Sequence, residues 1–171
     1  MYCRLPHNQS GLTLIESLIV VILLGIVAAA AVPRFPSTPA SAIHDTLQSN
    51  TQTLQRAIAL YAIQHNGIYP GQVRHTDGFK ARTAEEARVA IVAQLLLYSD
   101  ANGRTSSTRD SDHPFGPYLP EGIPINPLPP QSSDILATFD DSEIEAREQA
   151  GWKLSLPSGT ISPIYPARSD Q

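Results

Sequence analysis

The strongest hydrophobic pattern lies at the start of the chain, where residues 12–32 are almost all apolar. A helix over this run would span about 32 Å at roughly 1.5 Å per residue, close to the thickness of the hydrocarbon core of a bilayer. A helix buried in a small domain would present a polar face, and this run has none. A secretory signal peptide is an alternative, because residues 28–32 are small, but its apolar core would be shorter. The pattern therefore predicts a retained transmembrane helix.

Prolines characterise the next stretch, residues 33–40. A proline inside a helix removes a hydrogen bond and clashes with the preceding turn, at a cost of about 3 kcal/mol, so we expect a kink or break here. A second helix is predicted to begin by Ser41 and to end at residues 65–67, where Gly67 is a typical stop. Its apolar positions recur at near-helical spacing and are Ile43, Leu47, Leu54, Ile58 and Tyr61.

A shorter helix is predicted from Thr83 to about Tyr98. Thr83 can cap it, Glu86 can complete a capping box, and the residues that follow give one mostly apolar face. Residues 99–112 are polar without a period, which predicts an exposed loop. The proline-rich residues 114–130 can form neither a regular helix nor a central strand, so we expect extended chain that wraps over the domain.

Three short stretches near the end of the chain predict strands: residues 135–139, 152–156 and 160–164. The last two flank a Pro-Ser-Gly turn at 157–159, where glycine can adopt a positive φ, and so predict an antiparallel hairpin. The predicted order is therefore helices, a polar loop, extended chain and a C-terminal antiparallel hairpin.

Charge and cysteine content exclude some classes of protein. The 171 residues include 12 Lys and Arg against 16 Asp and Glu, for a net charge of -4, and no basic cluster is present. We therefore expect no nucleic-acid partner. Cys3 is the one cysteine, so the chain can form no internal disulfide.

Glu16 is the residue that fits least well in the apolar run. A carboxylate costs about 2.5–3.5 kcal/mol at the centre of a membrane helix and less near its end, and a residue that bears this cost is usually paired or functional. Glu16 could reach the headgroups from one turn inside the helix. Alternatively, if the chain were cut after Gly11, Glu16 could neutralise the new amine of Leu12, most usefully that of a neighbouring subunit.

The sequence G-L-T-L-I-E, the apolar run and V-P-R-F together resemble the class III signal of type IV pilins and pseudopilins. This resemblance implies that a prepilin peptidase cuts after Gly11 and N-methylates Leu12. It also implies that Glu16 guides subunit docking and that Pro33 disturbs the helix. Leu12 departs from the more usual phenylalanine, and the leader has Arg4 as its single basic residue.

The resemblance implies the α+β pilin-like fold, with a long N-terminal transmembrane helix that is kinked near Pro33–Pro39. A small domain of helix and antiparallel sheet would lie in the periplasm. Type IVa pilins commonly close a C-terminal loop with a disulfide that this chain cannot form, which favours pseudopilins. The implied segments are a leader at 1–11, a transmembrane and filament-core helix at 12–32, a proline-rich break at 33–40 and a periplasmic domain at 41–171.

Later segments resemble the major pseudopilins of type II secretion, for example L-Q-R-A-I-A-L-Y-A-I-Q-H-N-G-I-Y-P-G and G-W-K-L-S-L-P-S-G-T-I-S-P. The resemblance implies a non-enzymatic, single-pass subunit of the bacterial inner membrane, with its N-terminus in the cytoplasm. Its implied partners are the prepilin peptidase, further copies, other pseudopilins, the secretion assembly platform and membrane lipid. Two alternatives stay open: a pilus or competence filament subunit, and a membrane-anchored binding module that does not polymerise.

Catalytic motifs are absent from the sequence, and the histidines at 44, 65, 75 and 113 form no recognisable ligand pair, so we expect them on the surface. Calcium is the one cofactor considered, because major pseudopilins of this type often bind it near their C-terminal loops. Carboxylate and amide oxygens of one polar segment are the candidate ligands, although the segment lacks the remaining EF-hand positions. These candidates are Asp100, Asn102, Asp110 and Asp112.

Overall fold

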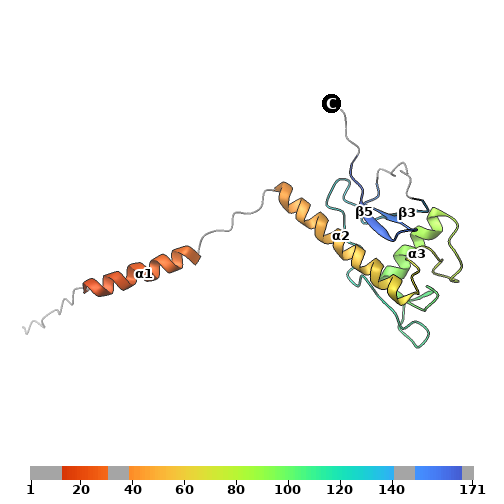
Figure 1. Ribbon diagram of the computed structural model, residues 1–171, viewed down its shortest axis with the longest axis horizontal. Coiled ribbons are helices and arrows are strands. Elements are labelled where there is room, and N and C mark those ends of the chain that lie inside the picture. The colour runs from red at the N-terminus through yellow and green to blue at the C-terminus, as the bar shows by residue number, and fades with distance from the viewer. Residues whose placement is uncertain (1–12, 31–38, 141–148, 167–171) are drawn as a thin grey trace, which may run out of the picture. The chain divides into compact units, whose positions relative to one another are not determined.

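The computed structural model of the chain describes residues 13–30, 39–140 and 149–166. It divides into two units, residues 1–37 and residues 38–171. The described residues form three helices and two small sheets, an α+β arrangement compatible with the predicted fold (Figure 1). The helices are α1 (Leu14–Ala30), α2 (Pro39–Gln64) and α3 (Ala84–Leu96), and the strands are β1 (Tyr98–Ser99), β2 (Thr105–Ser106), β3 (Ile135–Thr138), β4 (Trp152–Ser155) and β5 (Thr160–Pro163).

The first unit contains α1, a helix of 17 residues inside the run that the sequence predicts as helical. Among the described residues, no helix combines the length and the apolarity that crossing a membrane requires. The predicted break at 33–40 falls almost wholly outside the described residues. The next helix begins at Pro39, slightly before the predicted Ser41, because a proline is tolerated in the first turn, where its missing N–H would have had no partner.

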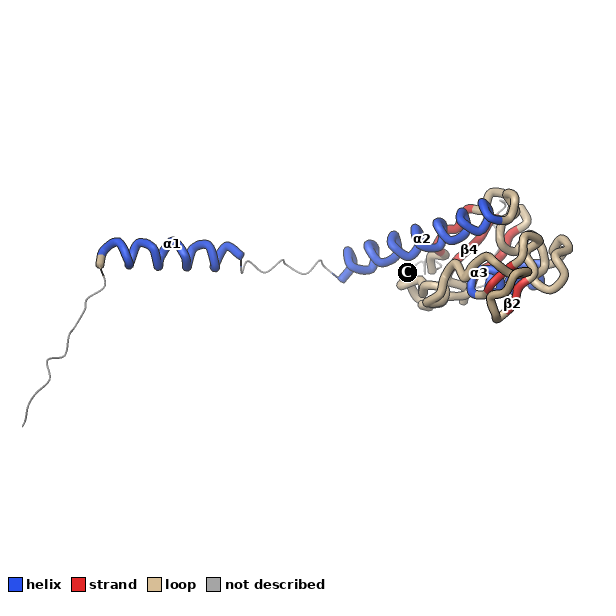
Figure 2. The backbone as a smooth tube through the Cα atoms, turned by 90° about the horizontal axis from the view of Figure 1, so that it is seen from below, coloured by secondary structure: helices blue, strands red, loops and turns tan. Residues whose placement is uncertain are grey.

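α2 is the long helix of the second unit, and its first turns project beyond the rest of the domain (Figure 2). Leu47 is its first buried residue. The helix ends as predicted near Gly67, with Asn66 and Gly67 at φ 55° and 84° and a hydrogen bond from the Gly67 N–H to the Ala62 carbonyl at 2.8 Å.

The core of the second unit lies between the two helices and the three-stranded sheet β3–β4–β5. α3 contacts β3, and α2 contacts β5. Burying these side chains removes apolar surface from water, which is the main stabilising term for such a small domain. The fully buried large side chains include Leu54, Ile58, Tyr61, Ile91, Leu95, Ile135, Trp152 and Leu154.

The sheet is mixed, which corrects the expectation of an antiparallel sheet. β4 and β5 form the predicted antiparallel hairpin, with Leu154 opposite Ile161. Gly159 takes the expected positive φ of 66°, and a Cβ atom there would collide with the Tyr69 ring. β3, however, pairs with β4 in parallel, with Ile135 opposite Trp152. Parallel neighbours need a connection of about a dozen residues or more, and the segment between β3 and β4 is long enough to provide it.

α3 is capped largely as predicted. The Thr83 hydroxyl accepts a hydrogen bond from the Glu86 backbone N–H at 3.1 Å, but the Glu86 carboxylate bonds the N–H of Arg82, one residue before the cap. The helix ends at Leu96 instead of Tyr98, since Tyr98 enters the antiparallel pair β1–β2. The prediction of an exposed loop over 99–112 is therefore wrong at its start.

The proline-rich segment 114–130 contains neither a helix nor a strand, as predicted, but turns and bends interrupt its chain. Hydrogen bonds from side chains elsewhere in the domain hold its backbone in place. Trp152 Nε1 donates to the Pro124 carbonyl at 2.8 Å, and Asn50 Nδ2 donates to the Ile125 carbonyl at 2.9 Å. The buried Asn126 donates to the Gly151 carbonyl at 2.7 Å, which joins this segment to the start of β4. Side chains thus replace the ladder bonds that proline cannot make.

Candidate functional site

α1 begins with a local turn built by Thr13. Its Oγ1 accepts a hydrogen bond from the Glu16 backbone N–H at 3.3 Å, and its carbonyl oxygen accepts one from the Ser17 N–H at 3.1 Å. A threonine in this role is a common N-cap, and it places Glu16 in the first turn of the helix. A carboxylate there is favoured by the positive end of the helix dipole.

Beyond Glu16 and Ser17 in its first turn, the described surface of α1 is apolar on all sides. Every residue from 13 to 26 is exposed, and Leu14 and Ile15 expose 88% and 67% of their surface. Soluble monomers rarely expose continuous apolar surface of this kind, which usually marks contact with protein or membrane. α1 is therefore the strongest candidate for an interaction site.

Glu16 is the acidic group of this helix. Its side chain makes no hydrogen bond or ion pair within residues 13–30, 39–140 and 149–166. An exposed carboxylate on an apolar helix is free to meet a cation that another chain supplies. Gly11, Leu12 and Pro33 lie outside the described residues, so cleavage, methylation and the kink stay predictions.

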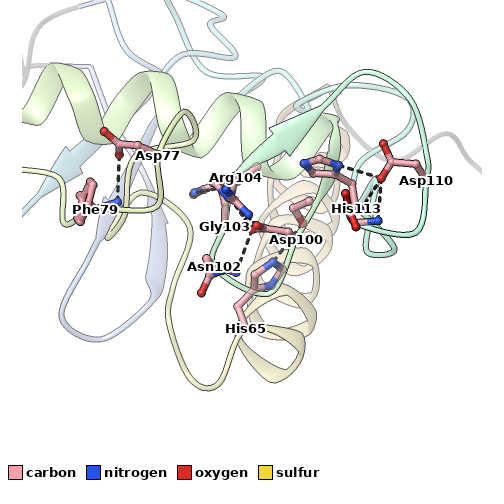
Figure 3. Close-up of polar contacts among 12 residues, drawn as sticks. His65, Asp77, Phe79, Asp100, Asn102, Gly103, Arg104, Asp110 and His113 are labelled. Carbon is pink, nitrogen blue, oxygen red and sulfur yellow. Dashed lines mark hydrogen bonds and ion pairs between the residues drawn. The ribbon is translucent and has the colours of Figure 1, made fainter.

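Asp100 is the centre of the turn that joins β1 to β2 (Figure 3). Its Oδ1 accepts hydrogen bonds from the backbone N–H groups of Asn102 at 2.9 Å and Arg104 at 2.8 Å, and its Oδ2 accepts one from Arg104 Nε at 2.7 Å. Burial alone would raise the pKa of the Asp100 carboxyl. The hydrogen bonds from Arg104 and Asn102 outweigh burial, so that the pKa lies below its ordinary value.

Asp110 organises a separate turn (Figure 3). Its Oδ1 accepts hydrogen bonds from the His113 Nδ1 at 2.9 Å and from the backbone N–H groups of His113 at 2.7 Å and Asp112 at 3.0 Å. The hydrogen bond from the His113 ring lowers the pKa of the Asp110 carboxyl, and the backbone bonds lower it further. Asp110 therefore also has its partners within the chain.

The calcium candidates thus belong to two separate turns. Among the residues that the structure describes, no group of three or more His, Cys, Asp or Glu side chains could hold a metal ion. Calcium takes about six to eight oxygen ligands. Because Asp100 and Asp110 already accept hydrogen bonds from the protein, the arrangement described does not fit that requirement.

His65 corrects the expectation that the four histidines lie on the surface. Its ring is fully buried and stacks on the Tyr61 ring at a centroid distance of 3.7 Å. Burial lowers the pKa of the His65 imidazole despite nearby hydrogen bonds. A signal was present in the sequence, since His65 continues the apolar series of Leu54, Ile58 and Tyr61 at helical spacing.

The His65 ring also contacts a serine, a pairing that could suggest nucleophilic catalysis. His65 Nδ1 donates to the Tyr61 carbonyl at 2.8 Å, and its Nε2 accepts from the Ser99 hydroxyl at 3.1 Å. His65 and Ser99 are both fully buried, however, so a substrate could not approach the hydroxyl in this structure. The pair ties the end of α2 to β1 and is a structural contact.

A pocket of about 480 Å³ opens beside the end of β3. Its size is within the range of small-molecule sites. The residues that line the pocket are Ile68, Gln72, Val73, Lys80, Phe139, Leu156 and Pro157. Nucleophilic or acid–base catalysis needs several reactive groups placed to act together, whereas Lys80 is the one titratable group of this lining.

Comparison with known proteins agrees with the importance of the N-terminal segment. Residues 6–32 match the family described as the prokaryotic N-terminal methylation motif. The chain is 39% identical over 64 residues to the type II secretion system core protein G of Pseudomonas aeruginosa, a match that covers 37% of this chain and 44% of that protein. No solved structure matches significantly. The motif and the similarity to core protein G together support a pseudopilin-like family for this chain.

Proposed function

We propose that the chain is a pseudopilin, a non-enzymatic subunit of a type II secretion-like filament that assists protein export. The observation that carries the proposal is Glu16, an acid without a partner among the described residues, in the first turn of a helix whose other described residues are exposed and, apart from Ser17 and Gly25, apolar. A helix that only anchors a domain in lipid needs no such acid, whereas a helix that docks on identical helices can use it.

Processing would create the partner that Glu16 lacks. A prepilin peptidase would cut after Gly11, remove the leader 1–11 and methylate the amine of Leu12. That amine would be a cation near the apolar boundary of the membrane. When it meets Glu16 of a neighbouring subunit, two charges that are costly in lipid become one ion pair.

Assembly would then follow from the surface of α1. Copies of the helix over residues 12–32 would leave lipid and pack against one another in the core of the filament, with Pro33 disturbing the helix where it leaves the membrane. Helices in lipid associate through close packing and polar contacts, and the Glu16 pair would supply the polar contact. The domain of residues 41–171 would lie outside that core.

The proposed location is the bacterial inner membrane, crossed once, with the N-terminus in the cytoplasm and the domain in the periplasm. The proposed partners are the prepilin peptidase, other pseudopilins, the inner-membrane assembly platform and surrounding lipid. We propose no nucleic-acid partner, since three of the six arginines of the described domain already pair with acids, Arg74 with Asp77, Arg88 with Glu85 and Arg104 with Asp100.

Two alternative functions would require different features of the chain. A pilus or competence subunit would use its domain to bind a surface or DNA, for which a basic patch would be needed. An anchored binding module would need neither the cut at Gly11 nor an acid at Glu16. The pocket beside β3 is the observation that favours a binding module, because it could take a small apolar ligand.

The intact mass of the mature chain, purified from membranes of cells that contain the peptidase, tests the proposal. The expected mass is that of residues 12–171 with one added methyl group. A chain that begins at Ala31 or Val32 would mean an ordinary signal peptide, and the filament function would then be wrong.

A further inference from the structure

The pocket beside the end of β3 is formed by three separate segments of the second unit. The first is the chain that follows α2, the second is the end of β3, and the third is the turn between β4 and β5. Five of the seven lining residues are apolar, namely Ile68, Val73, Phe139, Leu156 and Pro157. Small-molecule sites combine a lining of this kind with a few polar groups that fix the orientation of the ligand, and the volume of about 480 Å³ is within their range.

Hydrogen bonds hold the walls of this pocket in place. Gln72 Nε2 donates to the Leu156 carbonyl at 2.7 Å, and the Leu156 N–H donates to the Thr138 carbonyl at 2.9 Å. Gln94 Nε2 donates to the Val73 carbonyl at 3.0 Å. Each of the three segments is therefore bonded to another part of the domain. The pocket is preformed, so a ligand would not have to order its walls.

Lys80 is the one charged residue of the lining. It lies opposite Val73 in an isolated β-bridge and is exposed. Its ammonium group forms no ion pair or hydrogen bond with residues 13–30, 39–140 or 149–166. Gln72, the other polar residue of the lining, already donates through Nε2 and accepts through Oε1 from the Tyr69 N–H at 3.1 Å. Among the described residues, Lys80 is therefore the group of the lining that is available to a charged ligand.

We infer that this pocket binds a small monocarboxylate with an apolar body, which lies against Phe139 and Leu156 while its carboxylate meets Lys80. Leu156 is buried and Lys80 is exposed, so the apolar end enters first and the carboxylate stays near water. A lysine ammonium is a compact single charge and balances one carboxylate. The inference goes beyond the proposed function and does not depend on it, since a filament subunit and an anchored module could each carry such a site.

Octanoate and its neutral analogue octanamide test the two halves of the site. Ligand-observed NMR with the full-length chain in lipid nanodiscs measures binding, with empty nanodiscs subtracted. Octanoate should bind more tightly than hexanoate by about fourfold for each methylene group that is buried. It should bind about fivefold more tightly than octanamide, because an exposed ion pair contributes an effect of this size. Equal affinities for hexanoate and octanoate would overturn the inference.

Three variants of the full-length chain locate the ligand. Lys80→Met keeps the apolar stem of the side chain but removes its charge, so it should weaken octanoate about fivefold and leave octanamide unchanged. Phe139→Ala removes part of the apolar wall and should weaken both ligands to the same extent. Arg109→Met removes an exposed positive charge outside the lining, and this control should bind both ligands like the wild type.

The inference fails if Lys80→Met binds octanoate as tightly as the wild type does. It also fails if Phe139→Ala keeps the wild-type affinity, because the ligand would then lie elsewhere on the chain, or if the chain binds no more octanoate than empty nanodiscs. Glu16→Gln should bind octanoate like the wild type whether or not it assembles. Failure of the pocket is therefore distinguishable from failure of the proposed function.

Discussion

Arg104 donates hydrogen bonds to the Asp100 carboxylate from both its side chain and its backbone. The Arg104 Nε donates to Oδ2 of Asp100 at 2.7 Å, and the Arg104 backbone N–H donates to Oδ1 at 2.8 Å. The two residues close the turn of the β1–β2 hairpin, so the charge of a buried carboxylate is balanced within four residues. The Asp100 carboxylate thus has its counter-charge, Arg104, within the same turn.

Asp100→Ala should destabilise the domain by about 1–3 kcal/mol, because two backbone N–H groups of the turn lose their acceptor. Chemical denaturation of the soluble domain from residue 39 measures the change. Asp112→Ala is the matched control, since the Asp112 carboxylate is exposed, and it should stay within about 0.5 kcal/mol of the wild type. Equal effects of the two substitutions would contradict the role given to Asp100.

Millimolar calcium should leave the melting temperature of the same domain unchanged. A ligand that binds only the folded state stabilises it by RT ln(1 + [L]/Kd), and the oxygens of Asp100 and Asp110 are already engaged. Scanning calorimetry with calcium and with a chelator makes the comparison. A higher melting temperature in calcium would restore Asp100, Asn102, Asp110 and Asp112 as candidate ligands.

The sequence predicts best those features that depend on neighbours a few residues away. The cap at Thr83 and the hairpin turn at Gly159 arise from local hydrogen bonds and a positive φ, and both appear in the structure. The parallel pairing of Ile135 with Trp152 depends on a crossover between distant segments, which no local pattern records. The sequence predicts His65 on the surface because the residue is polar, although its spacing from Ile58 and Tyr61 continues the buried side of α2.

At the candidate site, the sequence identifies Glu16 by its conflict with the apolar run. The structure adds that Glu16 lies in a capped first turn and has no partner among the residues it describes, which a pattern of residue types cannot reveal.

Stability should fall below about pH 6.5 through His65. Burial lowers the pKa of this imidazole in the folded domain, whereas the unfolded chain keeps the ordinary value near 6.5. The unfolded state therefore binds a proton first, and the contribution of His65, complete above about pH 6.5, is lost as pH falls toward the lowered pKa. The free energy of unfolding should decrease by up to about 1.4 kcal/mol per pH unit in that window.

Urea denaturation at pH 8.0 and pH 5.5 measures this dependence. His65→Gln should be less stable at pH 8.0, where the ring packing on Tyr61 is lost, but should show a smaller change between the two pH values. His44→Gln removes an exposed histidine and should keep the wild-type change. A His65→Gln domain with the full wild-type pH dependence would assign the effect to another group.

Glu16→Gln should separate membrane insertion from assembly. The variant should still be inserted and cut after Gly11, because a neutral amide costs less in lipid than a carboxylate. Assembly should fail, because the incoming amine of Leu12 would be left without its counter-charge in a low-dielectric site, a loss that often costs about 3–5 kcal/mol. Ser17→Ala, one residue away in the same turn, is the control and should assemble normally. Crosslinking of membrane-resident subunits reads out both variants. If Glu16 only reaches toward the headgroups, Glu16→Gln will give the same ladder as the wild type, and the pairing with Leu12 must then be abandoned.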